Sequence, residues 1–387
     1  MKIESAKVLS KIPPYLFVEI DKAKRAARLQ GRDLIDLGIG DPDIPTPRYI
    51  IEALYKAAKD PSNHRYALDA GMPQLKQEIA NWHKKRFKVK LDASSEILPL
   101  IGSKEGLAHT PFTFLNTNDV ALVPDPAYPA YRNATILAGG KPYFMPLIET
   151  NNFLPDLKKI PTSILKRSKL IFVNYPNNPT AAIVPVRFLK ELVAFARKHN
   201  IIICFDLAYS EMCFDNYQAP SILQITGARD VAIEFHSLSK TYNMTGWRLG
   251  WVCGNKEIIA AIAKIKSNID SGVFQAIQLA GIAALKSKDS FKKKMAGIYQ
   301  QRRDVLINGL EKLGWVIDKP KATFYIWAKI PKKGVKSIDF SNLLLNRADI
   351  VVTPGVGFGK YGEGYIRFAL TQDKNRIKEA LQRLAVL

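Results

Sequence analysis

Cysteine is scarce in this chain: Cys204, Cys213 and Cys253 are its only three among 387 residues. An odd number without paired spacing argues against a disulfide framework and against a zinc site, and it indicates a reducing compartment. Long apolar runs are also missing, since stretches such as residues 201–205 fall far short of the roughly 18 residues that a membrane span needs. Residues 1–14 hold no apolar signal-peptide core. We therefore expect a cytoplasmic protein with no membrane partner.

Acidic residues are few relative to basic ones, at 35 Asp and Glu against 57 Lys and Arg, which gives a net charge of +22. A basic chain raises the possibility of a nucleic-acid-binding protein. The basic residues are, however, spread along the whole chain in short groups such as residues 84–85 and 292–294. We therefore expect a solvated basic surface and no nucleic-acid partner. The charge also suits anionic substrates or an anionic cofactor.

The remaining composition, 47% apolar and 24% charged residues, is that of a globular protein. An amphipathic helix is predicted at residues 186–198, between two short apolar runs. Strand–helix–strand order at this spacing indicates parallel βαβ units, whose functional residues gather at the carboxyl ends of the strands. The predicted strands of this region are residues 120–123, 170–173, 201–205 and 231–235.

The last third of the chain has a different pattern, with a long helix at residues 289–313, later strands and a closing helix at 373–386. Those strands are predicted at residues 324–330, 350–353 and 365–370. The fold class expected is α/β, with a mostly parallel central sheet, helices on both faces and a smaller α+β domain from the two chain ends. The domain boundaries expected are 46–284 for the large domain, 285–387 for the small domain and 1–45 for an N-terminal segment that packs with it.

A lysine follows two serines directly after the predicted strand 231–235, in the order Ser237, Leu238, Ser239, Lys240. Both serine hydroxyls can donate to phosphate oxygens, and Arg248 can pair with a phosphate through two nitrogens. Partial burial at a strand end would lower the pKa of Lys240 and make its amine a nucleophile. The alternative is that this short motif is fortuitous and Lys240 is a surface charge.

Three further segments place polar groups after predicted strands. Asp206 ends the strand 201–205, where a carboxylate is costly unless it is paired, and a cationic ring nitrogen would supply that pair. Tyr209 follows three residues later, and Asn178 lies in a turn after the strand 170–173. Residues 102–106 form a predicted strand-to-helix turn whose backbone N–H groups would bind phosphate. The alternatives are a helix cap or ion pair for Asp206, an ordinary turn for Asn178, and an ordinary helix start capped by Ser103 for residues 102–106.

Two other side chains complete the pattern. Tyr128 could stack on a planar ring, although a loop tyrosine is more often a packing residue. Arg367 lies inside an apolar strand and needs a carboxylate partner, supplied either by a substrate or by a structural Asp.

No Walker-type phosphate loop, HExxH motif or metal-spaced Cys/His cluster appears, so we expect no metal. His83 and His109 are expected at the surface or at helix ends. Together these parts describe a site for pyridoxal phosphate.

With these residues in view, the sequence resembles the class I/II aminotransferases of pyridoxal phosphate fold type I over nearly the whole chain. Within them it is most similar to the LL-diaminopimelate aminotransferases. The general resemblance rests on residues 38–43, 66–71, 178–179, 206–209 and 237–240 and on Arg367. The narrower one rests on residues 13–17, 102–106 and 268–275.

The resemblance implies a role for each matching cofactor residue. Lys240 would bind the cofactor covalently and then carry the proton, and Asp206 would pair with the pyridine nitrogen. Asn178 and Tyr209 would contact the ring hydroxyl oxygen, and Tyr128 would stack on the ring. The catalytic residues implied are thus Lys240, Asp206 and Tyr209. The phosphate would be held by Ser103, the backbone of Lys104, Ser237, Ser239 and Arg248.

The resemblance also implies a homodimer with shared active sites, in which Tyr66 reaches the phosphate of the partner subunit. Tyr15, Gly40, Asn268 and Arg367 would bind the substrate, with Arg367 on its α-carboxylate. Two positions depart from the family pattern. Ala181 replaces the usual glycine after Asn-Pro-Thr, and Ala127 stands where glycine is common before the stacking tyrosine.

The function expected is transfer of an amino group between an amino acid and a 2-oxo acid, best assigned to LL-diaminopimelate and 2-oxoglutarate in lysine biosynthesis. One alternative keeps the cofactor and changes the donor to aspartate, alanine or an aromatic amino acid. Another is a β-eliminating C–S lyase of the same fold. A different class is a basic nucleic-acid-binding protein with a relic enzyme fold. Distal-group recognition depends on loop positions that no motif encodes.

Overall fold

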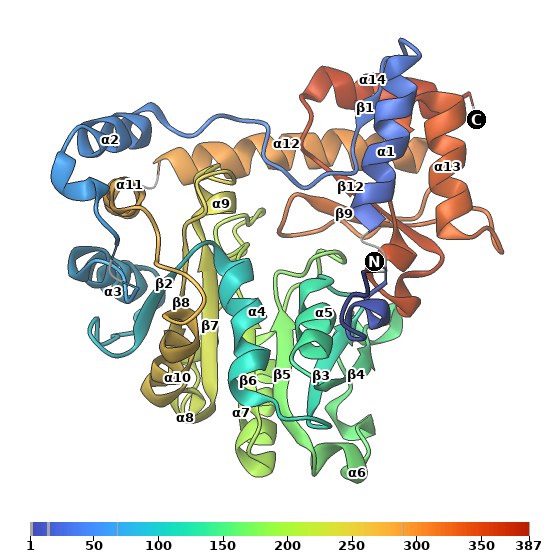
Figure 1. Ribbon diagram of the computed structural model, residues 1–387. Coiled ribbons are helices and arrows are strands. Elements are labelled where there is room, and N and C mark those ends of the chain that lie inside the picture. The colour runs from blue at the N-terminus through green and yellow to red at the C-terminus, as the bar shows by residue number, and fades with distance from the viewer. Residues whose placement is uncertain (1–2, 14–15, 68, 289, 387) are drawn as a thin grey trace.

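The computed structural model describes residues 3–13, 16–67, 69–288 and 290–386 (Figure 1). Its centre is a seven-stranded sheet in which five neighbouring strands, from β7 to β4, run parallel, while β8 lies antiparallel to both of its neighbours. In sheet order the strands are β2 (Ile97–Leu100), β8 (Gly250–Gly254), β7 (Ala232–Ser237), β6 (Ile202–Asp206), β5 (Ser168–Asn174), β3 (Val120–Asp125) and β4 (Lys141–Pro146). The predicted α/β class is therefore confirmed.

Helices cover both faces of this sheet. Side chains point alternately to the two faces along each strand, and both sets are apolar, so both faces must be buried. In β5, Leu170 and Phe172 face one apolar cluster, whereas Ile171 and Val173 face another. The first cluster is closed by α4 (Ser103–Phe114), α5 (Ala130–Leu137) and α10 (Lys256–Lys266). The second is closed by α3 (Pro73–Phe87), α7 (Val186–His199) and α11 (Gln275–Lys286). The remaining helices of this region are α2 (Arg48–Ala58), α6 (Thr162–Leu165), α8 (Ala228–Val231) and α9 (Leu238–Thr241).

The last third of the chain forms a separate apolar cluster around a three-stranded antiparallel sheet, β11-β12-β9. The long helix α12 (Ser290–Lys312), orange in Figure 1, runs from the end of α11 towards these strands. The strands are β9 (Tyr325–Lys329), β11 (Thr353–Pro354) and β12 (Tyr365–Ala369), and the other helices are α13 (Ser337–Ala348) and α14 (Lys374–Leu384). Helix α1 (Leu16–Leu29) comes from the N-terminal segment.

The strand predicted at 350–353 is two strands in the structure. β10 (Ile350–Val351) pairs in parallel with β1 (Ile35–Asp36), whereas β11 pairs antiparallel with β12. One extended segment thus serves two sheets, which an apolar run in the sequence does not reveal. The domain boundaries 1–45, 46–284 and 285–387 stay a prediction.

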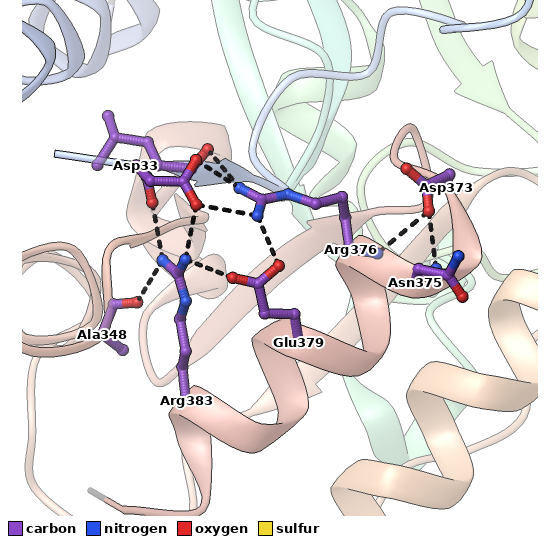
Figure 2. A network of polar contacts seen from close by, with 8 residues as sticks. Asp33, Ala348, Asp373, Asn375, Arg376, Glu379 and Arg383 are labelled. Atoms are coloured by element: carbon purple, nitrogen blue, oxygen red, sulfur yellow. Dashed lines mark hydrogen bonds and ion pairs between the residues drawn. The ribbon is translucent and has the colours of Figure 1, made fainter.

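Ion pairs also connect the two chain ends (Figure 2). Asp33 Oδ1 accepts from Arg376 Nη2 at 2.8 Å, and its Oδ2 accepts from Arg383 Nη2 at 2.8 Å. Glu379 lies between the two arginines on α14 and contacts both at 2.5 Å. The hydrogen bonds from Arg376 and Arg383 lower the pKa of Asp33. The network joins the segment before β1 to the closing helix.

Within the part of the chain that the structure describes, no helix has the length and apolar character that a bilayer span needs.

Candidate functional site

A cavity of about 330 Å³ opens where β5, β6 and β7 end, between the large sheet and β12. Parallel strands bring these ends together, since Asn174 pairs with Asp206 and Asp206 pairs with Phe235 in register. Twelve of the residues selected from the sequence line it: Gly40, Ser103, Lys104, Tyr128, Asn178, Asp206, Tyr209, Ser237, Ser239, Lys240, Arg248 and Arg367.

Lys240 lies in the short helix α9 directly after β7, so the strand carries its amine into the cavity. Its Nζ donates to the carbonyl oxygen of Gly40 at 2.9 Å. The pKa of Lys240 is lowered to about 8, mainly by burial; Asp41 opposes this shift, and the guanidinium groups of Arg367 and Arg248 contribute to it. A substantial fraction of the amine is therefore neutral, and so nucleophilic, near neutral pH.

Asp206 is the last residue of β6 and is 6% exposed. Burial raises the pKa of this carboxyl to about 6, although hydrogen bonds from Tyr131 and from the N–H of Ala208 favour its ionised form. Tyr131 Oη donates to Asp206 Oδ2 at 2.6 Å. Sequence reasoning missed Tyr131. Its position three residues after Tyr128, at the start of α5, was the available signal.

Arg367 is 2% exposed in β12 and reaches from the small sheet to the large one. Its Nη1 donates to Asn178 Oδ1 at 2.8 Å, and its Nη2 donates to the carbonyl oxygen of Gly38 at 2.7 Å. The guanidinium also lies 4.1 Å from the ring centroid of Tyr325. Nη2 also lies 3.4 Å from the hydroxyl of Thr353, and the guanidinium lines the cavity.

Tyr325 lines the cavity and was also missed by sequence reasoning, because it lies in an apolar strand without a motif. Its hydroxyl is 3.1 Å from that of Tyr209. A Cβ atom on Gly40 would lie 1.9 Å from Tyr325 Oη, so a glycine is required for the tyrosine to approach here. The backbone at Gly40 therefore contacts both Tyr325 and Lys240.

Residues 101–105, called the phosphate-binding turn after their predicted role, join β2 to α4 and adjoin Arg248. Gly102 has φ +74°, and a Cβ atom there would lie 2.2 Å from Arg248 Nη2. A Cβ atom on Gly250 would lie 2.8 Å from the backbone nitrogen of Ser103. Glycines therefore allow three chain segments to converge at the start of α4, where the first N–H groups of a helix have no intrahelical acceptor. The N-cap residue is Gly102, not Ser103 as the alternative interpretation had it.

Three of the selected residues are not among those that line the cavity. Tyr66 is 90% exposed. Asn268 is exposed as well, and its amide donates to the carbonyl oxygen of Lys264 at 2.8 Å. Tyr15 lies outside the described residues. The expected contributions of these three residues stay predictions.

The expectation for His83 and His109 was wrong, because both side chains are buried. His83 lies behind β7 and β8, where its Nε2 accepts from Trp251 Nε1 at 3.1 Å. Its neighbour His236 is 2.6 Å from Glu234 Oε1. Helix α3 carries His83 onto the sheet, and helix packing of this kind is not visible in sequence spacing.

Comparison with known proteins identifies the family. The sequence model of the aminotransferase class I and II family matches residues 32–384. The chain belongs to this family. It is 53% identical to the LL-diaminopimelate aminotransferase of Syntrophobacter fumaroxidans over the full length of both chains. It is 50% identical to that of Moorella thermoacetica, covering 99% of this chain and 98% of the relative.

Solved structures agree with this result. BacF from Bacillus subtilis with bound substrate superposes with a TM-score of 0.97 at 38% identity, covering 100% of this chain and 98% of BacF. An aspartate aminotransferase from Thermus thermophilus superposes with a TM-score of 0.93 at 26% identity, with full coverage of both chains. The expected aminotransferase activity and the fold type I architecture are therefore confirmed.

The buried carboxyl of Asp206 gives a pH prediction. The pKa of Asp206 is about 6 in the folded chain, against its usual 3.8. Between these two pH values the folded chain therefore binds more protons than the unfolded chain. The free energy of unfolding therefore falls as pH rises from about 4 to 6, by about 3 kcal/mol from this group alone. Asp206→Asn should remove that fall. Urea unfolding of the wild type and the variant, both free of cofactor, measures this pH dependence from pH 4 to 7. The assignment would be wrong if the free energy of unfolding changed with pH by the same amount in the two proteins.

Proposed function

We propose that this aminotransferase uses pyridoxal phosphate to move the amino group of LL-diaminopimelate to 2-oxoglutarate. One observation carries the proposal: a single cavity holds an amine of lowered pKa, a buried carboxylate and a buried guanidinium, contributed by Lys240, Asp206 and Arg367. These are the groups that such a transfer requires for covalent attachment, for a cationic ring and for a substrate carboxylate. The named relatives supply the substrate.

The residues present fit the cofactor. Asp206 needs a cation because its surroundings disfavour an unpaired charge, and a protonated pyridine nitrogen supplies one. Asn178 and Tyr209 would hold the ring hydroxyl oxygen, and Tyr128 would cover one face of the ring. The phosphate would be held by the first turn of α4 at Ser103 and Lys104 and by Ser237, Ser239 and Arg248. When bound, pyridoxal phosphate supplies an electrophilic carbon and an electron sink.

The chain's own residues would perform the remaining tasks. The amine of Lys240 would attach the cofactor and later move the proton at the substrate α-carbon, because it is partly neutral at pH 7 and lies inside the cavity. Arg367 would fix the α-carboxylate through two parallel hydrogen bonds. Asn178 would connect these functions, since it accepts from Arg367 and is placed to contact the ring hydroxyl.

The proposal includes a homodimer. Tyr66 and Asn268 are exposed and are not among the residues that line the cavity of their own chain. The family resemblance assigns Tyr66 to the phosphate of the partner subunit, and we infer from its exposure that Asn268 serves the partner's site as well. Tyr15 and Gly40 would join Asn268 and Arg367 around the substrate. The excess of positive charge suits the anionic cofactor and acceptor. Lysine biosynthesis in the cytoplasm is the setting proposed for the reaction.

The other donors and the C–S lyase are less well supported, because the relatives at about 50% identity are LL-diaminopimelate aminotransferases over nearly their full length. We expect a panel of amino donors with 2-oxoglutarate to give the largest kcat/KM for LL-diaminopimelate. A margin of about tenfold over aspartate, alanine and phenylalanine corresponds to about 1.4 kcal/mol of transition-state binding. A larger kcat/KM for any of those three would transfer the assignment to that donor.

Lys240→Ala should abolish repeated turnover, because the site loses both its attachment point and its proton carrier. Proton transfer alone is worth roughly 10²–10⁴-fold. The measurement is amino transfer by the purified variant at saturating cofactor, with exposed Lys264→Ala as the control. Near-normal turnover would remove Lys240 from the site.

Arg367→Lys should lower kcat/KM for donor and acceptor alike, since both substrates carry an α-carboxylate and an ammonium cannot form the planar pair. The expected loss is about 2–5 kcal/mol. Cofactor absorbance should be largely retained, because Arg367 is assigned to substrate and Arg248 to phosphate. Loss of cofactor with unchanged substrate affinity would reverse those two assignments.

A mixture of Tyr66→Ala and Lys240→Ala chains should recover activity that neither variant has alone. In a mixed dimer, one of the two sites receives Tyr66 from the Lys240→Ala chain and Lys240 from the Tyr66→Ala chain. Activity is measured after the chains are refolded together and the tagged heterodimer is isolated. Isolated heterodimers without activity, where Tyr66→Ala alone is impaired, would refute a shared site.

A further inference from the structure

A buried ion cluster connects the end of α10 with the start of α4. Lys266 has no exposed surface, and its Nζ donates to Glu105 Oε1 at 3.1 Å and to Asp270 Oδ1. His109 Nδ1 lies 3.3 Å from the same oxygen of Glu105. A buried ammonium between two carboxylates is held firmly, because removing either side leaves an uncompensated buried charge. The cluster lies outside the cavity and has no part in the reaction proposed above.

The first branch of the cluster fixes the phosphate-binding turn. Glu105 is in the first turn of α4, where its Oε2 accepts from the backbone N–H of Ile101. One oxygen of this carboxylate therefore holds the backbone before the helix, while the other is held by Lys266. Ser103 and Lys104, the cavity-lining residues of this turn, lie between the two anchored positions, Ile101 and Glu105.

The second branch fixes the loop 267–274, which follows α10. Asp270 Oδ1 accepts from the backbone N–H of Gly272 at 2.9 Å as well as from Lys266. Gly272 has φ +79°, so the carboxylate stabilises a turn that few other residues could adopt. The same loop carries Asn268, two residues before Asp270.

Charge gives the cluster a second effect. Glu105 lies in the same helical turn as the groups assigned to the phosphate, and a carboxylate there repels a phosphate dianion. Lys266 neutralises this carboxylate. Without Lys266, Glu105 and Asp270 would be two partly buried like charges, with Glu105 in the phosphate-binding turn itself.

We propose that Lys266 is a positioning residue that links the phosphate-binding turn to the loop 267–274. Through this link, a phosphate group bound in the cavity also orders the loop, and with it Asn268, the residue assigned to the partner's substrate. The inference rests on the proposed function and adds a route by which cofactor binding in one subunit prepares the site of the other.

The test compares the wild type with Lys266→Met and with Lys264→Met, a matched control two residues earlier on α10, where the side chain is exposed. Pyridoxal phosphate is titrated by absorbance, and hydrogen exchange of peptides that cover residues 267–274 is measured with and without it. The wild type and Lys264→Met should show protection of the loop on binding. Lys266→Met should bind at least about tenfold more weakly, because a buried charge pair is broken. It should also show no added protection of the loop at saturation.

Glu105→Gln serves as the second variant in case Lys266→Met does not fold, since it keeps the size of the side chain and a hydrogen-bond acceptor. It should weaken the link, so that binding no longer protects residues 267–274. Wild-type affinity and wild-type protection in whichever variants fold would overturn the inference and leave the proposed function intact.

Failure of the wild type to bind pyridoxal phosphate would instead refute the proposed function. The link would then be tested with inorganic phosphate as the probe, at concentrations that protect the turn 101–105 from exchange. Protection of residues 267–274 that is present in the wild type and absent in Lys266→Met supports the link. Equal protection in the two proteins refutes it.

Discussion

Burial of one carboxylate at the end of a central strand is the constraint on which the rest of the site depends. Asp206 ends β6, between the ends of β5 and β7, where water is largely excluded. Its charge is supported by the hydroxyl of Tyr131 and the N–H of Ala208, yet burial still raises its pKa to about 6. A cation beside this carboxylate would stabilise its ionised form further. The parallel register then places Lys240, at the end of the next strand, beside the same space.

The small sheet contributes part of the cavity wall, through Tyr325 and Arg367. Arg367 comes from β12, and it meets the large sheet through its hydrogen bond with Asn178. Gly38 and Gly40 enter from the N-terminal segment and contact Arg367 and Lys240 through their carbonyl oxygens. Three distant parts of the chain are thus joined by hydrogen bonds made within the cavity wall. Movement of the small sheet would therefore change the substrate contacts and the cofactor contacts together.

Twelve of the residues selected from the sequence line one cavity, for a physical reason. Ser237, Asp206 and Asn178 each end or follow an apolar run, and parallel strands bring such ends to one edge. Tyr131 and Tyr325 were missed because their roles come from helix and sheet packing between elements far apart in the chain. His83 was misplaced for the same reason, since its burial under the sheet depends on how α3 docks. The run 350–353 was read as one strand, because pairing partners are not encoded in apolar periodicity.

The distribution of charge explains how one small cavity can accept several anions. Four cationic side chains line it, on Lys104, Lys240, Arg248 and Arg367, against two carboxylates, on Asp41 and Asp206. Other buried cations are neutralised where they lie, as Arg302 is by Asp43 and Arg303 by Asp215, so they add little to the field in the cavity. The excess of positively charged side chains in the cavity is therefore a property of the site and not merely of a basic chain. A phosphate dianion and a substrate carboxylate would reverse this excess, and Lys240, whose pKa is already lowered by the neighbouring guanidinium groups, would regain part of its basicity as they bind. Anion binding and proton transfer are in this way coupled through one amine.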